Sequence, residues 1–209
     1  GIDVGGNPLK NLNGIEDSKN TLKNLYATNC VDSSIEITED ESMDEEAAEA
    51  EQKKQRTLVD ASALEGFTKL ETVDLSSNML TGIDFLASLE SLTSVTLTGN
   101  EIASVPASLK KLTKLTSFSA ANNKITAIAG LKEATALTTL TLDDNKLTSL
   151  DGVGKLTKLT SLSASSNEIA DLGDLGGATA LTTLTLNENK ISDVKQIASL
   201  TKLTSINLS

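Results

Sequence analysis

The sequence predicts a solenoid, a stack of similar repeats that together bury one continuous core. One pattern of Leu and Asn recurs from Leu70 onward, and its asparagines are spaced by 22 residues with a single step of 23. A period of about 20 to 50 residues is typical of stacked repeats. Within each period, alternating apolar residues give way to apolar residues three apart, so each repeat combines a strand with a return segment.

One repeat shows both patterns clearly. Leu140 and Leu142 alternate with threonines, as in a short β-strand with one buried face. After Asn145, Leu147 and Leu150 are three apart, which is the spacing of extended or 3₁₀ segments. Ordering 22 residues costs about 30 kcal/mol, and about seven apolar side chains return at most about 2–3 kcal/mol each. A single repeat therefore needs neighbours on both sides.

One Asn follows each strand, at the position of a tight turn. Such a turn leaves backbone N–H and C=O groups facing inward, and an amide side chain can satisfy both kinds. We therefore expect a buried ladder formed by Asn78, Asn100, Asn123, Asn145, Asn167 and Asn189. Upstream, Asn7 in "IDVGGNPLKNLNGI" and Cys30 in "LKNLYATNC" take the same position, and we expect Cys30 to be a small buried structural residue.

Blocks such as "LETVDLSSNML" and "LTTLTLDDNKL" resemble the leucine-rich repeat family, "LxxLxLxxNxLxxLxxLxxLxx", in its 22-residue class. That class includes phosphatase-regulatory subunits, dynein-light-chain-type axonemal proteins and bacterial internalins. The resemblance runs from Leu58 to Ser209 and implies an α/β solenoid, a curved right-handed horseshoe with a parallel concave β-sheet and short 3₁₀ or extended convex segments. It implies a binding protein but no particular partner, because the class serves many.

The chain divides into three parts by sequence. Residues 1–31 contain N-terminal repeats with a truncated start, 32–57 an acidic insertion, and 58–209 six repeats of 22–23 residues plus a final strand. Cys30 and Asn78 are about two repeats apart, so we expect the acidic stretch to replace a strand. Neither end shows a polar cap, so we expect a segment of a longer chain or a subunit covered by neighbours.

The insertion "EDESMDEEAAEAEQKKQR" has the order of charges that a helix favours. Ser42 can cap a helix with Glu45 as its capping-box partner, and Lys53, Lys54 and Arg56 fill the last turn. We expect a solvated helix protruding from the solenoid, or a disordered loop with helical tendency. Residues 36–51 hold nine acids and no base, which gives either a solvated face or a docking segment for a basic partner. The docking candidates are Glu39, Asp40, Glu41, Asp44, Glu45 and Glu46.

The strand residues between the buried leucines should form the concave face, where a partner would bind. This face is a nearly uniform array of hydroxyls, and from Leu70 onward its strands lack the Trp, Tyr and Arg that dominate binding hot spots. The one concave aromatic residue is Tyr26, next to the acidic insertion. The candidate contact residues are Tyr26, Asp74, Thr96, Thr139, Thr141, Asp143, Asp144, Ser163, Thr183, Thr185 and Glu188.

Composition argues against several functions. The formal net charge of −11 disfavours nucleic acid and anionic membrane surfaces, and no apolar run approaches the roughly 18 residues of a membrane span. The chain has no His and a single Cys, so it lacks the commonest general base and metal ligand and cannot form an internal disulfide. We expect no catalytic site, no metal site and no cofactor.

Three functions fit these observations. The first is a non-enzymatic protein–protein interaction module, a scaffold or docking subunit of a larger assembly, intracellular and binding a protein with a basic surface. The second is a bacterial surface adhesin of internalin type. The third is an ice- or lattice-binding array, since Thr and Ser would repeat about every 7 Å along each strand and about every 4.8 Å between strands.

Overall fold

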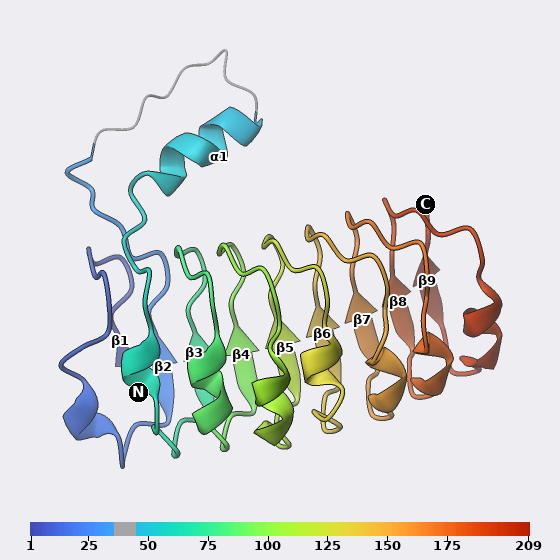
Figure 1. Cartoon of the computed structure of the whole chain (residues 1–209), viewed down its shortest axis with the longest axis horizontal. Helices are drawn as coiled ribbons and strands as arrows, with labels where there is room; N and C mark the ends of the chain where they lie inside the picture. Colours follow the sequence, from blue (N-terminus) through green and yellow to red (C-terminus); the bar gives the residue numbers. More distant parts are fainter. Residues whose placement is uncertain (36–44) are drawn as a thin grey trace.

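The computed structural model describes residues 1–35 and 45–209, and their strands form one open, parallel nine-stranded sheet (Figure 1). Its spatial order, β1 to β9, is the order of the chain, so each strand pairs with the next repeat. The strands are β1 (Ile2–Asp3), β2 (Asn24–Tyr26), β3 (Thr72–Asp74), β4 (Ser94–Thr96), β5 (Ser117–Ser119), β6 (Thr139–Thr141), β7 (Ser161–Ser163), β8 (Thr183–Thr185) and β9 (Ser205–Asn207). The solenoid predicted from the repeat is confirmed.

Short 3₁₀ helices return the chain on the other side of the core. They are η1 (Glu16–Ser18), η2 (Ser62–Leu64), η3 (Asp84–Ser88), η4 (Ala107–Lys111), η5 (Ala129–Leu131), η6 (Val153–Lys155), η7 (Leu175–Gly177) and η8 (Lys195–Ser199). The spacing of three had predicted 3₁₀ segments because residues i and i+3 eclipse one another in this helix. One α-helix, α1 (Glu45–Lys53), lies outside the stack.

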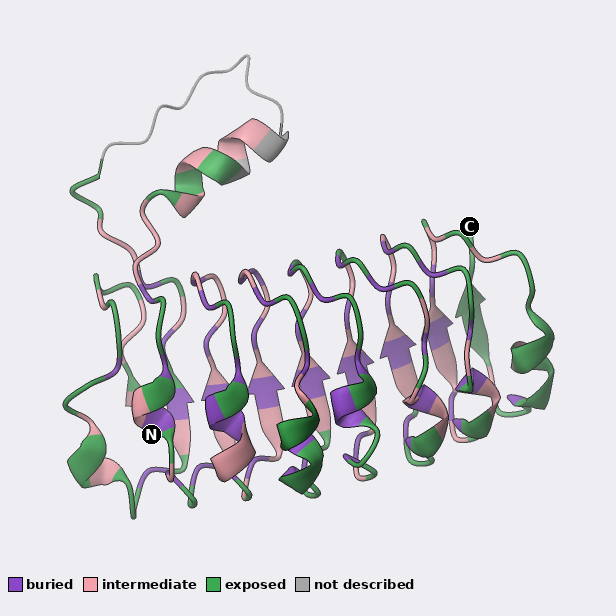
Figure 2. Cartoon of the chain, in the orientation of Figure 1, coloured by how far each residue is buried: buried purple, intermediate pink, exposed green. Residues whose placement is uncertain are grey.

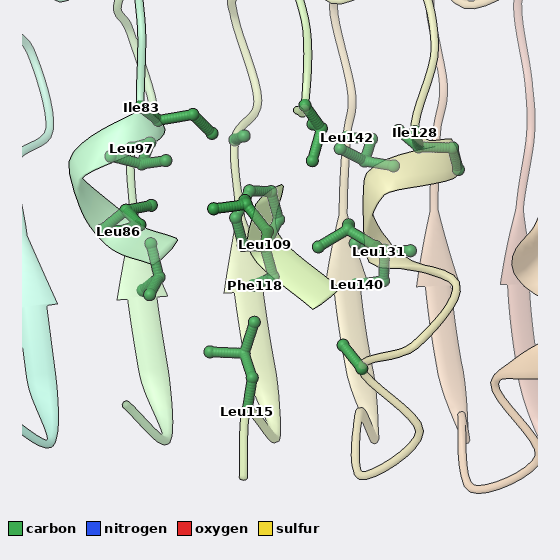
Figure 3. Close-up of a cluster of buried hydrophobic side chains, with 14 of the residues drawn as sticks. Ile83, Leu86, Leu97, Leu109, Leu115, Phe118, Ile128, Leu131, Leu140 and Leu142 are labelled. Carbon is green, nitrogen blue, oxygen red and sulfur yellow. The ribbon is translucent and has the colours of Figure 1, made fainter. Parts of the chain in front are cut away.

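The core lies between the sheet and the 3₁₀ segments. Each of the strands β3 to β8 has a buried central residue between two half-buried ones, and the register places central residues side by side, as with Leu140 and Leu162. Figure 3 shows Leu109 and Leu131, from η4 and η5, clustered with Phe118 and other strand residues. Figure 2 shows this buried layer running through the stack.

The acidic insertion lies within a single repeat, so the expectation that it replaces a strand was wrong. Strand β2 pairs directly with β3, with Leu25 opposite Val73. Thr57 N–H donates to the Cys30 carbonyl at 2.7 Å, so the chain leaves after Cys30 and re-enters at Thr57. Figure 1 shows α1 standing out from the edge of the stack where the strands end.

Hydrogen bonds after the insertion restore the regular repeat. Met79 N–H donates to the Leu58 carbonyl at 2.9 Å, as Glu101 N–H donates to the Leu80 carbonyl at 2.9 Å one repeat later. Leu58 therefore occupies the position of Leu80, two residues beyond the ladder. The separation of 48 residues between Cys30 and Asn78 is one 22-residue repeat plus residues 31–56, a length that resembles two repeats by coincidence.

Candidate interaction surfaces

The turn after each strand is held by an amide side chain that connects two repeats. Asn145 Nδ2 donates to Leu142 O in its own repeat (3.1 Å) and to Ala120 O in the preceding one (2.9 Å). Its Oδ1 accepts from Ile125 N–H at 2.9 Å. Corresponding bonds form at Asn78, Asn100, Asn123, Asn167 and Asn189.

The first two members of the predicted ladder differ from the rest. Asn7 is exposed and donates within its own repeat, to Val4 O (2.8 Å) and Gly5 O (3.1 Å). Cys30 is fully buried, and its thiol makes one weak contact with Ala27 O at 3.6 Å. Burial raises the pKa of the Cys30 thiol, which disfavours the thiolate.

A second ladder, made of threonine hydroxyls, was missed in the sequence. The residue before each strand from β4 to β9 donates its hydroxyl to the backbone carbonyl one repeat earlier at 2.9–3.1 Å, for example Thr160 to Thr138. The recurring "LT" pair carried this signal. The donors are Thr93, Thr116, Thr138, Thr160, Thr182 and Thr204, and the first acceptor is Glu71.

The predicted contact residues lie on or beside the open face of the sheet. The strand members are half-buried, and the register aligns them, so that Thr141 lies opposite Ser163 and Ser163 opposite Thr185. The strand members are Asp74, Thr96, Thr139, Thr141, Ser163, Thr183 and Thr185, with Tyr26 on β2, while Asp143, Asp144 and Glu188 lie in the turns that follow.

Polar side chains on this face bond to one another across repeats. Asp143 Oδ1 accepts from the Ser163 hydroxyl (2.6 Å) and from Ser165 N–H (2.7 Å). The Ser165 hydroxyl donates to Asn187 Oδ1 at 2.7 Å, and Asn207 Nδ2 donates to the same oxygen at 3.3 Å. These bonds hold the side chains in fixed positions before any partner arrives.

Two of the predicted contact residues also shape their turns. Asp144 and Glu188 each precede a ladder Asn and adopt positive φ, 54° and 57°. Asn and Asp tolerate this left-handed conformation better than most residues, whereas Glu does so less readily. The Ser166 hydroxyl donates to Glu188 Oε2 at 2.8 Å. These positions therefore serve the fold as well as the surface.

Tyr26 lies between two acidic residues on neighbouring strands. The register places Asp3 of β1 and Asp74 of β3 on either side of it. Its side chain is 39% exposed. Asp74 Oδ1 accepts from the hydroxyl and the N–H of Ser76, at 2.6 and 3.0 Å. The arrangement offers an aromatic ring and two carboxylates to a cationic group, which rings also attract.

The base of the acidic insertion is attached to the turns of the next repeats. Arg56 Nη1 donates to Gly99 O at 3.1 Å, and Lys53 Nζ lies 3.4 Å from Glu101 Oε1. Glu101 also pairs with Lys124. Burial raises the pKa of Glu101, but the Lys124 hydrogen bond and the charges of Lys53 and Lys124 outweigh it and leave the pKa below its ordinary value.

Most of the predicted acidic docking segment is not described. Glu39, Asp40, Glu41 and Asp44 lie outside the described residues, as does the proposed cap Ser42. Glu45 and Glu46 begin α1. Lys53 ends this helix, while Lys54 and Arg56 follow it rather than forming its last turn. A hollow of about 260 Å³ beside the helix is lined by Asn29, Val31, Gln52, Gln55 and Arg56.

Within residues 1–35 and 45–209, no three His, Cys, Asp or Glu side chains gather in a way that could hold a metal ion. No helix in the described part of the chain is long and apolar enough to cross a membrane.

The chain is similar to known leucine-rich repeat proteins. The family model "Leucine Rich repeats (2 copies)" matches residues 135–177. Among solved structures, internalin C2 from Listeria monocytogenes has a TM-score of 0.80 at 26% identity, covering 99% of this chain and 79% of its own. Together with the sheet and its ladders, these matches support a leucine-rich repeat protein, and this fold is generally a non-enzymatic interaction fold.

Two further solved structures are similar to this chain. Internalin F from Listeria monocytogenes has a TM-score of 0.76 at 27% identity over 99% of this chain, which spans 59% of that protein's chain. The ectodomain of the Arabidopsis thaliana receptor kinase GASSHO1/SCHENGEN3, in complex with CASPARIAN STRIP INTEGRITY FACTOR 2, has a TM-score of 0.62 at 27% identity, covering 76% of this chain and 22% of its own. No curated protein matches this chain significantly.

Proposed function

We propose that this chain is a non-enzymatic protein-interaction module that docks as a scaffold subunit in a larger assembly. The observation that carries the proposal is the hydrogen-bonded open face of the sheet, from Asp143 through Ser163 and Ser165 to Asn187. A face whose side chains are already fixed loses little conformational entropy on binding, so fewer contacts suffice for a given affinity.

The N-terminal end of this face favours a partner with a basic surface. Tyr26 lies between Asp3 and Asp74, and the acidic insertion leaves the same repeat four residues later, after Cys30. An exposed ring beside carboxylates suits a Lys or Arg side chain. The contacts of Arg56 with Gly99 and of Lys53 with Glu101 fix the base of the insertion, so α1 is held at the edge where the strands end and is a second contact element there (Figure 1).

The insertion can be removed without disturbing the solenoid, which gives a clean test. Deleting residues 31–56 and joining Cys30 to Thr57 restores a regular repeat, because these residues already share a hydrogen bond of 2.7 Å. The face can be blocked separately by Thr141→Arg with Thr185→Arg. A matched control is Thr126→Arg with Ala170→Arg, at exposed positions outside the strands.

Co-purification from the native source, with each variant as bait, tests the proposal. We expect the control to retain a specific partner and the face variant or the deletion to lose it. Loss with the face variant alone assigns the contact to the sheet, and loss with the deletion alone assigns it to the insertion. A partner retained by both variants would contradict the proposal.

A second candidate is a bacterial surface adhesin of internalin type, favoured by the TM-score of 0.80 with internalin C2 over 99% of this chain. The two candidates differ in location, because the scaffold is proposed to be cytoplasmic. Fractionation of the source cells with antibody detection separates them. Recovery in the cytosol supports the scaffold, whereas protease-accessible protein on intact cells supports the adhesin.

A further inference from the structure

One register position on the edge where the strands begin alternates between lysine and a small residue. From β3 onward, it is the residue just before the leucine that leads into each strand, and the lysines precede β3, β5, β7 and β9. The lysines are Lys69, Lys114, Lys158 and Lys202, and the small residues between them are Ser91, Ala136 and Ala180. We call these four exposed lysines the lysine row. Figure 1 shows that the strands begin at the edge of the stack opposite α1.

The charge of the lysine row is not neutralised within the described chain. Among the described hydrogen bonds and ion pairs, none involves these four side chains. Two acids close to the first lysines of the row pair with lysines outside it: Glu71 with Lys23 at 2.8 Å, and Glu90 with Lys111 at 3.5 Å. A chain of net charge −11 thus keeps an ordered line of free positive charges on one edge.

The spacing of the row indicates the shape of its ligand. Neighbouring strands lie about 4.8 Å apart, so lysines on every second strand repeat at about 9.6 Å. A polyproline II helix rises 3.1 Å per residue with three residues per turn, so every third side chain lies on one side at intervals of about 9.3 Å. The accumulated mismatch over four lysines is about 1 Å, which a flexible lysine stem absorbs.

Other ligands fit the row less well. A β-strand presents same-side residues about every 6.6 Å, which does not match the row. Single-stranded nucleic acid is held by stacking on aromatic rings, and the edge from Lys69 onward has none exposed.

We propose that the lysine row binds an acidic polypeptide segment in the polyproline II conformation, with Asp or Glu at every third position. Each carboxylate would meet one lysine, and the small residues Ser91, Ala136 and Ala180 leave room for the peptide between them. This surface is separate from the open face and the insertion, so its ligand is distinct from the basic partner proposed above.

Two labelled peptides of identical composition test the proposal by fluorescence anisotropy at low salt. One repeats Glu-Pro-Pro, and the other carries the same glutamates in one block followed by the prolines. Because exposed ion pairs are individually weak but act together here, we expect the periodic peptide to bind about tenfold more tightly. Equal affinity for the two peptides, or no binding of the periodic one, overturns the proposal.

A charge-neutral variant tests the spacing in the protein. Lys158→Ala with Ala136→Lys moves one lysine to the adjacent repeat, and the preference for the periodic peptide should disappear. Lys114→Gln with Lys158→Gln should weaken binding, while Lys10→Gln with Lys146→Gln, which makes the same charge change off the row, should not. Equal weakening by both pairs, or binding of a heparin fragment but not of the peptide, overturns the proposal. Thermal unfolding checks that each variant is folded.

Discussion

The regular repeats and the interrupted repeat differ at the ladder position, and the insertion begins immediately after that position. In a regular repeat, Asn145 donates across to Ala120 O and accepts from Ile125 N–H, so the turn is tied to its neighbour. In the interrupted repeat, Cys30 contributes one weak thiol contact within its own repeat. Asn78 of the following repeat still bonds to Cys30 N–H and to Ala27 O. The comparison indicates that a turn whose own ladder side chain makes no bond to the preceding repeat can extend into a long segment while the strands on both sides remain paired.

The largest effect that we expect from this difference is on the stability of variants at the ladder position. Asn145→Ala leaves the buried Ile125 N–H without its acceptor and removes the amide's bonds to Ala120 O and Leu142 O, and we expect a loss of about 3 kcal/mol in the free energy of unfolding. Cys30→Ala removes one weak contact and should cost about 1 kcal/mol. Urea unfolding of both variants measures the two losses, and equal losses would show that the amide is not what distinguishes the two repeats.

Removing the insertion sharpens the same comparison. The chain without residues 31–56 should fold, since Cys30 and Thr57 are already hydrogen-bonded. Adding Cys30→Asn to this shortened chain should stabilise it by about 1–2 kcal/mol, because each hydrogen bond of the new amide contributes about 1 kcal/mol. Differential scanning calorimetry compares the two shortened chains. A lower melting temperature for the Asn variant would show that Cys30 suits its repeat for another reason.

A mutation in the threonine ladder should lower the stability less than a mutation in the asparagine ladder. Thr160→Val keeps the shape of the side chain and removes the hydroxyl that donates to Thr138 O. That carbonyl keeps the N–H groups of Thr160 and Ser161 as donors, so we expect a loss of about 0.5–1 kcal/mol. Chemical denaturation measures it. A loss as large as that of Asn145→Ala would make the hydroxyl ladder equal to the amide ladder.

The smallest effect expected is the pH dependence of the contact between the insertion and the solenoid. The pKa of Glu101 is lowered in the folded chain, so its contribution to stability is present above the ordinary pKa of a glutamate and is lost as the pH falls through the lowered value. The difference in melting temperature between the wild type and Glu101→Gln should therefore shrink with acidification. A difference that grows on acidification would contradict the lowered pKa.

Much of the fold could be predicted because its parts are local and repeat at a fixed interval. The alternation at Leu140 and Leu142 predicted the strand, and the spacing of three after Asn145 predicted the 3₁₀ segment. The threonine ladder left its signal in the repeated "LT" pair, but hydroxyls on strands are common enough that the pattern does not separate a structural donor from a surface residue.

The sequence by itself determined the repeat, its strand and turn, and the chemistry of the ladder position, because each follows from side chains close together in the chain. Only the tertiary structure decided that residues 31–56 belong to one repeat, since the pairing of β2 with β3 joins residues far apart in sequence. Only the tertiary structure shows the ion pair between Lys53 and Glu101 and the hydrogen bond between Ser163 and Asp143. Such contacts depend on how the repeats stack, and the local periodicity of the sequence does not predict them.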